Sequence, residues 1–152
     1  MDRHAFSLTL ARPLGTAKGT IRRREGDLLR LDAGEYGIGE ATPLPGWTES
    51  LADCRAALDA VAEAGDEAIR AAVDAESHDP LAAASTTLTD PLDDAPAARH
   101  AVESAVLDAR GRGEDRPLAA VLGDDPATTV PVNATVGDGS PEEAVAAAID
   151  AV

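Results

Sequence analysis

Residues 3–12 alternate between apolar and polar or small positions with the period of a β-strand. Phe6, Leu8 and Leu10 are separated by single small or polar residues, so their side chains would share one face of a strand. Residues 13–19, which contain Pro and Gly, predict a flexible loop. Strand-like patterns cover residues 3–12, residues 20–24 and 27–32 (two pieces or one long bulged strand), and residues 37–42. The pattern predicts a three-stranded antiparallel meander.

From residue 51 the apolar period becomes that of a helix. One helical face is formed by Leu51, Cys54, Leu58, Val61 and Ala62, after a cap at Thr48 or Ser50. The remaining elements expected are a helix end at Gly65, a weaker helix over 66–76, mostly loop over 77–97, a clear helix over 98–110 ended by Gly111 and Gly113, and a short helix over 117–122. A meander followed by helices defines an α+β fold.

The pattern changes once more near the end of the chain. Residues 130–136 read as an apolar strand, and a Gly-rich loop leads from it to Ser140-Pro141-Glu142-Glu143, which has the spacing of a helix capping box. Strand, short loop and capped amphipathic helix are typical of the opening of a parallel β/α repeat. We therefore predict one domain over 1–128 and the start of an incomplete β/α barrel over 129–152. A lone parallel strand lacks a partner, so we expect the sequence to be cut short.

Charge and composition indicate which binding partners and which cellular setting the protein can have. The chain has 28 acidic and 13 basic residues, a formal charge of -15, and Lys18 as its sole lysine. This balance argues against nucleic acid, and Arg22-Arg23-Arg24 is interpreted as a solvated strand face. Acid-rich, Lys-poor composition favours a halophilic protein. A single cysteine, no signal-peptide pattern and no apolar run near ~18 residues predict a cytoplasmic protein that does not span a membrane.

The loop around Trp47 is the strongest candidate for ligand contact. It lies between a strand-like stretch and a helix start, and loops carry binding residues more often than regular elements do. The alternative is that Trp47 covers a small core. Gly37-x-Gly39 lacks the third glycine and the following helix of a dinucleotide site, and the His, Ser and paired Asp residues show no catalytic or ligand spacing. We predict no catalytic and no metal-binding residue in this chain.

The chain resembles a known family. Three stretches carry the resemblance: residues 39–46 (GEATPLPG), residues 99–112 with 117–123, and residues 130–137 (VPVNATVG). They are similar to the N-terminal capping domain of the enolase superfamily, mandelate racemase/muconate-lactonizing type. Among its members, the o-succinylbenzoate synthases of salt-loving archaea are the most similar. Dipeptide epimerases and N-acylamino acid racemases share the same frame.

The resemblance implies a lid on a β/α barrel enzyme. There, a lysine base and Mg2+ remove a proton next to a substrate carboxylate, and loss of water completes a lyase step in menaquinone biosynthesis. The family's catalytic lysines and metal ligands lie on later barrel strands, so we expect no activity from this chain alone and, in a split enzyme, a partner chain that carries the barrel. The substrate-facing residues implied are Leu14, Gly15, Lys18, Trp47, Asn133 and Thr135. A non-enzymatic α+β binding module remains the alternative.

Overall fold

The computed structural model describes residues 1–16, 18–44, 46–75, 77, 79–82, 84–123, 125–133, 136 and 139–150. The chain divides into two compact units, each described here by itself. One unit contains Met1–Phe6 and Glu25–Pro126, and the other contains Ser7–Arg24 and Ala127–Val152.

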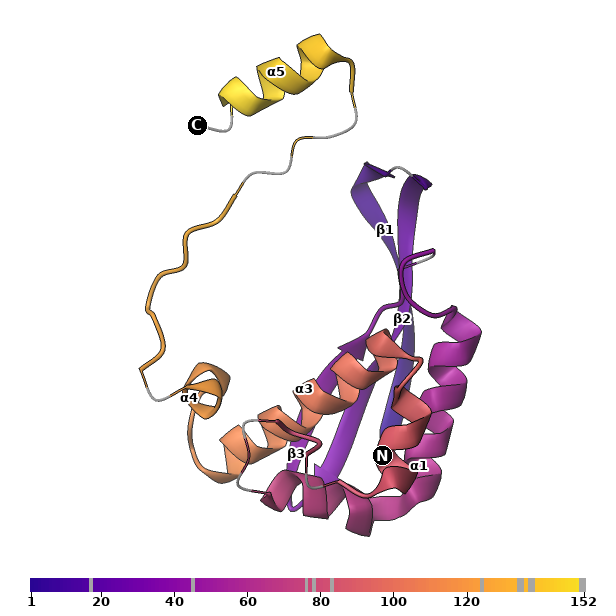
Figure 1. The fold of residues 1–152 in the computed structure, drawn as a ribbon, viewed down its shortest axis with the longest axis vertical. Coiled ribbons are helices and arrows are strands. Elements are labelled where there is room, and N and C mark those ends of the chain that lie inside the picture. Colours follow the sequence, from indigo (N-terminus) through magenta and orange to yellow (C-terminus); the bar gives the residue numbers. More distant parts are fainter. Residues whose placement is uncertain are drawn as a thin grey trace. The chain divides into compact units, whose positions relative to one another are not determined.

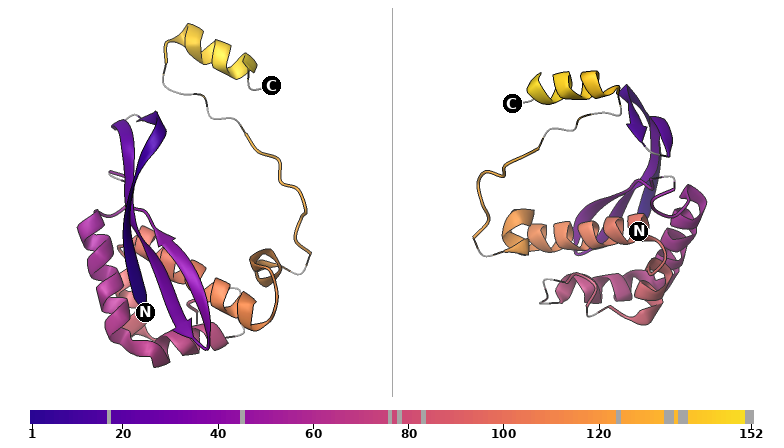
Figure 2. Two further views of the ribbon diagram at one scale, coloured as in Figure 1. Left: turned by 180° about the vertical axis from the view of Figure 1, so that it is seen from behind. Right: turned by 45° about the horizontal axis from the view of Figure 1, so that its top comes forward.

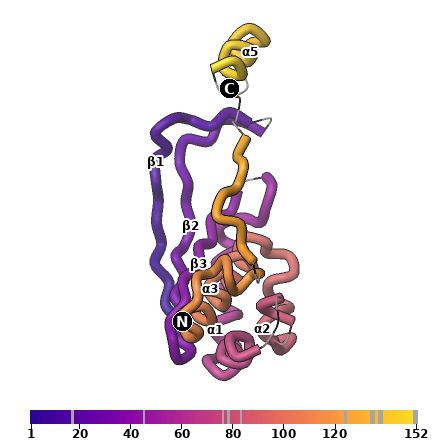
Figure 3. Tube along the Cα trace, turned by 90° about the vertical axis from the view of Figure 1, so that its left-hand side faces the viewer, coloured from indigo at the N-terminus to yellow at the C-terminus, as the bar shows by residue number. Residues whose placement is uncertain are grey.

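The strands form the predicted meander. Strands β1 (Asp2–Thr16), β2 (Gly19–Ala33) and β3 (Glu35–Ala41) follow in the order β1-β2-β3 (Figures 1 and 3). β2 and β3 are antiparallel, with Asp27 opposite Ala41 and Ala33 opposite Glu35. The α+β class and the three-stranded sheet are confirmed, and β2 is a single strand rather than two pieces.

The loop expected over residues 13–19 is largely wrong. β1 continues through Pro13 to Thr16, and β2 begins at Gly19. Proline is tolerated here because β1 is an edge strand, where one side of the backbone needs no donor for a ladder bond. The first two strands therefore form a hairpin that is longer than the sequence pattern predicts.

The helices follow the expected order with shifted ends. They are α1 (Leu51–Asp74), α2 (Thr86–Thr89), the 3-10 helix η1 (Asp90–Leu92), α3 (Pro96–Gly113), α4 (Leu118–Leu122) and α5 (Pro141–Asp150). Ser50 caps α1, since its Oγ accepts the Asp53 N–H at 3.1 Å. The expected break at Gly65 is confirmed: its φ of 87° interrupts the helical backbone inside α1. Residues 86–92, predicted as loop, contain α2 and η1.

Helix α3 continues through Gly111 and ends at Gly113, so only the second of the two glycines expected to stop it does so. A Cβ at this position would lie 2.8 Å from the Arg116 carbonyl oxygen and 3.2 Å from Val121 Cγ2. Gly111 is therefore required because the following segment and α4 approach the helix closely, and it does not terminate α3.

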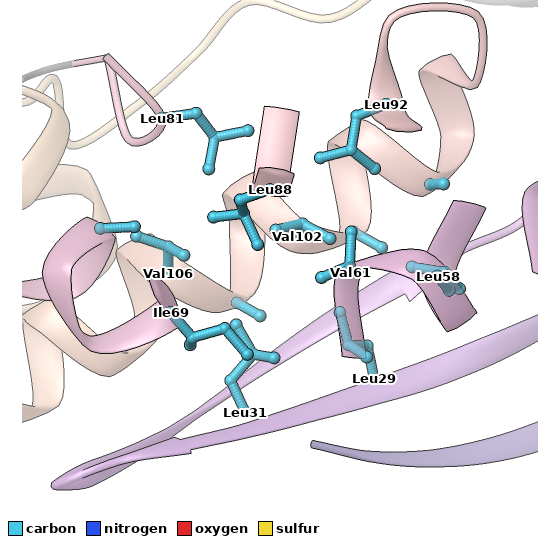
Figure 4. Close-up of a cluster of buried hydrophobic side chains, with 14 of the residues drawn as sticks. Leu29, Leu31, Leu58, Val61, Ile69, Leu81, Leu88, Leu92, Val102 and Val106 are labelled. Carbon is cyan, nitrogen blue, oxygen red and sulfur yellow. The ribbon is translucent and has the colours of Figure 1, made fainter. Parts of the chain in front are cut away.

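The core lies between the sheet and the two long helices, which cover the same face of the sheet (Figure 2). Figure 4 shows its fully buried Leu and Val side chains, drawn from β2, α1, α2 and α3. They include Leu29, Leu31, Leu58, Val61, Leu88, Val102 and Val106. Buried Asp27 accepts a hydrogen bond from Arg55 Nε at 2.8 Å, which pairs its charge.

Helix α3 contacts β3 without intervening side chains. A Cβ at Gly37 would lie 1.8 Å from the Ala105 carbonyl oxygen, and one at Gly39 would lie 1.9 Å from that of Ala101. The carboxylate of Asp108 on α3 also accepts the Ile38 N–H at 2.9 Å. Because β3 is an edge strand, α3 occupies a backbone group that would otherwise be free for pairing with another chain.

The expected strand over residues 130–136 is wrong for the residues that the structure describes there, 130–133 and 136. A strand needs a neighbour for its backbone groups, and the sheet contains only β1, β2 and β3 among the described residues. The helix that follows is confirmed as α5, together with its capping box: Ser140 N–H donates to Glu143 at 2.8 Å, and Glu143 N–H donates to Ser140 Oγ at 3.3 Å. No described helix is long and apolar enough to cross a membrane.

Candidate functional site

The loop after β3 is held in shape by its own hydrogen bonds. The Leu44 carbonyl accepts N–H groups from Trp47 at 2.9 Å and Thr48 at 3.0 Å, while Thr48 Oγ1 accepts the Leu44 N–H at 2.8 Å. Gly46 has a φ of 79°, which favours glycine at this turn. The result is a small closed turn that leaves Trp47 59% exposed, so Trp47 does not cover the core.

Glu49 fastens this loop to the start of α3. Its carboxylate accepts the N–H groups of Ala97 and Ala98, both at 3.0 Å. The residue before α3 is Ala95, whose side chain makes no capping bond. A carboxylate at a helix N-terminus satisfies unpaired donors and complements the helix dipole. Glu49 therefore fixes the position of the loop that carries Trp47.

Cys54 lies beside the Glu49 carboxylate, and its thiol has low reactivity. Its side chain is fully buried. Burial, followed by the charge and the hydrogen bond of Glu49, raises the pKa of the Cys54 thiol to about 12. Because the thiolate is the reactive form, Cys54 is a packing residue and no nucleophile.

A shallow cavity of about 450 Å³ opens next to the loop. It is lined by Glu40, Thr42, Thr48, Pro96, Ala97 and His100. Thr42 Oγ1 donates to the Glu40 carboxylate. The cavity thus offers a carboxylate, hydroxyls and an imidazole, which suit hydrogen bonding to a polar group.

The hairpin tip brings together three of the residues predicted to face substrate. Leu14 and Gly15 end β1, and Lys18 follows in the turn, where its N–H donates to Thr16 Oγ1 at 3.2 Å. Asn133 is exposed and lies outside any helix or strand. Thr135 lies outside the described residues. Trp47 belongs to the unit that contains Glu25–Pro126, and the other predicted residues belong to the second unit.

Sequence reasoning missed Glu49, Glu40 and His100. One signal for Glu49 lies at the start of α3. This helix begins after Ala95, which is not a Ser, Thr, Asp or Asn and cannot cap it, so the first backbone N–H groups need an acceptor from elsewhere in the chain. Glu40 and His100 are 60 positions apart and carry no local signal. Only the packing of α3 on β3 places them around one cavity.

Magnesium does not fit the residues that the structure describes. Among them, no group of three or more His, Cys, Asp or Glu side chains is arranged to hold a metal ion. The acidic residues are spread over strands, helices and the segments between them.

The described residues thus form a meander covered by two long helices, with Trp47 on a loop that Glu49 anchors. The family model for the mandelate racemase / muconate lactonizing enzyme N-terminal domain matches residues 4–123. The chain therefore belongs to this family of the enolase superfamily, as its capping domain.

Solved structures with the same fold agree with this assignment. A putative mandelate racemase/muconate lactonizing enzyme from Roseovarius nubinhibens is 26% identical with a TM-score of 0.72, over 93% of this chain and 38% of that one. The same bacterium's protein complexed with magnesium is 25% identical with a TM-score of 0.73, over 95% and 38%. A Herpetosiphon aurantiacus protein is 27% identical with a TM-score of 0.57, over 74% and 30%.

The chain spans only 30% to 38% of the length of these solved chains. No curated protein matches it. The activity of a whole enzyme is accordingly a matter of proposal.

Proposed function

We propose that this chain is the lid of an o-succinylbenzoate synthase-like lyase that works in menaquinone biosynthesis. The observation that carries the lid assignment is the family match over residues 4–123. The choice of subgroup rests on the overall resemblance of the sequence to that subgroup, since the three motif stretches belong to the family as a whole. The substrate is a small carboxylate, and the barrel that completes the enzyme comes from further sequence or from a partner chain.

In this proposal the lid encloses and orients substrate. Trp47 offers a large, mostly exposed aromatic face on a loop that Glu49 holds in place, and a rigid aromatic contact restricts a ligand at low entropic cost. Leu14, Gly15 and Lys18 at the hairpin tip, together with Asn133 and Thr135, contribute the remaining contacts. Proton abstraction and Mg2+ binding are assigned to the barrel, because the described residues here do not fit the metal.

Two other functions are alternatives to this proposal. A dipeptide epimerase or an N-acylamino acid racemase would use the same lid with different loop contacts. An Agrobacterium tumefaciens enolase family member with homology to dipeptide epimerases has a TM-score of 0.61 and 20% identity, a likeness that concerns the fold alone. The second alternative is a non-enzymatic α+β binding module, in which the Trp47 loop contacts another protein.

The first experiment compares this chain with the native protein from its source cells. An intact mass near 15.5 kDa would direct the search to a barrel-bearing partner, whereas a mass more than twice as large would indicate one long enzyme. The native protein or complex is then assayed with Mg2+ for dehydration to o-succinylbenzoate, and for epimerisation of dipeptides and N-acylamino acids. We expect dehydration by the complete enzyme and none by the 152-residue chain; Mg2+-dependent turnover by that chain alone would contradict the proposal.

A matched pair of variants tests the lid. Trp47→Ala in the complete enzyme should raise KM about tenfold or more, since one large apolar contact is worth over 1.4 kcal/mol. Trp47→Phe keeps an aromatic ring and should recover most of the affinity. Equal KM values for both variants and the parent would remove Trp47 from the substrate site.

We also propose a cytoplasmic, salt-rich setting for the protein. A charge of -15 on 152 residues creates self-repulsion that dissolved salt screens. Urea unfolding at increasing KCl should therefore show rising stability up to molar salt. Unfolding in molar KCl with full stability in dilute buffer would contradict a halophilic origin.

A further inference from the structure

Trp47 is followed along the chain by three residues that each make a different stabilising contact. Thr48 Oγ1 accepts the Leu44 N–H at 2.8 Å, which closes the turn around Trp47. Glu49 accepts N–H groups at the start of α3, and Ser50 caps the start of α1. The turn that carries Trp47 is thus joined directly to both long helices.

The Glu49 carboxylate makes the largest number of these contacts. The Ala97 N–H donates to its two oxygens at 3.0 and 3.2 Å, and the Ala98 N–H donates to one of them at 3.0 Å. The Cys54 thiol on α1 is also hydrogen-bonded to this carboxylate. A charged group that accepts several donors is held in one orientation, because moving it would leave the donors unsatisfied.

The charge of Glu49 is compensated by these donors and not by a cation. No ion pair among the described residues includes Glu49, although its side chain is only partly exposed. The N–H groups and the positive dipole end of α3 therefore stabilise the carboxylate. If these bonds were lost, the carboxylate would recover its solvation by moving toward water, and the turn with Trp47 would move with it.

The helix that Glu49 contacts packs directly on the sheet. A Cβ at Gly39 would lie 1.9 Å from the Ala101 carbonyl oxygen, and the Asp108 carboxylate accepts the Ile38 N–H at 2.9 Å. Backbones packed this closely have little room for relative movement. Glu49 therefore connects the turn to a rigid part of the domain.

We propose that Glu49 is a positioning residue, which holds Trp47 as a preformed wall of the substrate site. This inference rests on the proposed lid function, in which Trp47 contacts substrate. A side chain that already has its bound orientation loses little conformational freedom when the substrate arrives. Glu49 thus strengthens substrate binding without touching the substrate, and the N-terminus of α3 becomes part of the support of the site.

The single tryptophan allows a direct test on the 152-residue chain. Time-resolved fluorescence anisotropy separates local motion of Trp47 from the slower tumbling of the molecule. We expect Glu49→Gln to increase the amplitude of this local motion about twofold, because a neutral amide holds the N–H groups of α3 less strongly than a carboxylate does. The control Glu63→Gln makes the same change at an exposed position of α1 and should leave the amplitude unchanged.

The positioning role is wrong if Glu49→Gln folds and its Trp47 motion equals that of the parent. Circular dichroism and the urea midpoint establish whether each variant is folded. Should Glu49→Gln fail to fold, Glu49→Asp takes its place, since it keeps the charge but is one methylene group shorter. The same increase in Trp47 motion is expected for it, and an unchanged amplitude would again overturn the proposal.

A double-mutant cycle in the complete enzyme tests whether Glu49 acts through Trp47. Glu49→Gln alone should raise KM about threefold and change kcat by less than about twofold. In a Trp47→Ala background, the same substitution should change KM by less than about twofold, because the wall that Glu49 positions is absent. An equal rise in KM with and without Trp47 would show that Glu49 acts by another route.

The two readouts separate failure of this inference from failure of the proposed function. Unchanged Trp47 motion in Glu49→Gln overturns the positioning role, whatever the kinetics show. A KM that Trp47→Ala leaves unchanged refutes the substrate contact of the proposed function, whereas increased motion in Glu49→Gln still supports the positioning of the loop by Glu49.

Discussion

Helices α3 and α5 carry similar sequence patterns but differ completely in their packing. Each has an apolar stripe at helical spacing, formed in α3 by Ala98, Ala101, Val102, Ala105, Val106 and Ala109 and in α5 by Val145, Ala148 and Ile149. The α3 stripe is entirely buried, whereas no residue of α5 is buried and its Ile149 is 70% exposed. An apolar stripe thus identifies the face that a helix can bury, and another element must provide the cover.

Helix α3 packs unusually close to strand β3. Gly37 and Gly39 let the backbone of β3 meet the carbonyl oxygens of Ala105 and Ala101, and small alanines line the facing side of the helix. Its N-terminus is capped by Glu49 from the preceding loop region, whereas α5 is capped by its own Ser140 and Glu143. Helix α3 depends on distant residues for both its packing and its cap, whereas α5 depends on local residues for its cap and has no buried residue among those described. Four predictions test this contrast.

The largest effect is expected from Gly39→Val. Its Cβ would lie 1.9 Å from the Ala101 carbonyl oxygen, so α3 would have to move away from the sheet. We expect a loss of about 3 kcal/mol or more in the free energy of unfolding, although valine favours strands. Urea denaturation measures it. Gly113→Ala is the control, because the nearest atom to a Cβ there is 4.0 Å away and alanine favours a helix; equal losses for both variants would refute the close contact.

The second prediction makes the same change in both helices. Val106→Ala removes fully buried methyl groups and should cost about 2 kcal/mol. Val145→Ala acts at a side chain that is 60% exposed and should change stability by less than about 0.5 kcal/mol. Both values come from urea unfolding of the full chain. A large loss at Val145 would show that the face of α5 is covered in solution.

The sequence was sufficient to predict elements whose cause is local. The meander follows from alternation, the α3 stripe from helical spacing, and the α5 cap from residues three positions apart. It failed where distant residues decide the outcome. The strand expected over 130–136 had the right composition but no neighbour to pair with among the described strands, and Gly111 looked like a helix end because the approach of Arg116 and Val121 has no local sequence signal.

The candidate site shows the same limit. Trp47 was predicted as a ligand contact because a large aromatic residue in a turn can be recognised from the sequence alone. Glu49 was missed, since its partners Ala97 and Ala98 lie 48 and 49 residues further along the chain. The cavity between Glu40 and His100 exists only once α3 has packed on β3. A pattern in sequence can therefore locate a loop, but the contacts that position the loop depend on the tertiary fold.

The third prediction concerns the distant cap of α3. Glu49→Gln keeps the shape of the side chain but weakens its bonds to Ala97 N–H and Ala98 N–H, and it should cost about 1 kcal/mol. Urea unfolding measures this loss, with the exposed residue Glu63→Gln as the control. Because Glu49 helps to raise the pKa of Cys54, the variant should also react faster with a thiol reagent at pH 9. A stability loss no larger than that of the control, with unchanged thiol reactivity, would contradict this role.

The smallest effect is expected at the local cap of α5. The Ser140 N–H and then its hydroxyl hold the pKa of the Glu143 carboxyl below its ordinary value. A lowered carboxyl pKa in the folded state adds stability above the unfolded pKa, and this contribution is lost as the pH falls through the folded value. Because α5 packs on nothing described, the loss should appear as fraying of α5 alone, seen by NMR as random-coil shifts for residues near Ala144 at low pH. Ser140→Ala removes the hydroxyl but keeps the backbone N–H, so it should return the Glu143 titration only part of the way toward its ordinary pKa and fray α5 at neutral pH, with the urea midpoint of the chain unchanged. If that midpoint fell along with the α5 signals, α5 would be coupled to the core and the contrast with α3 would fail.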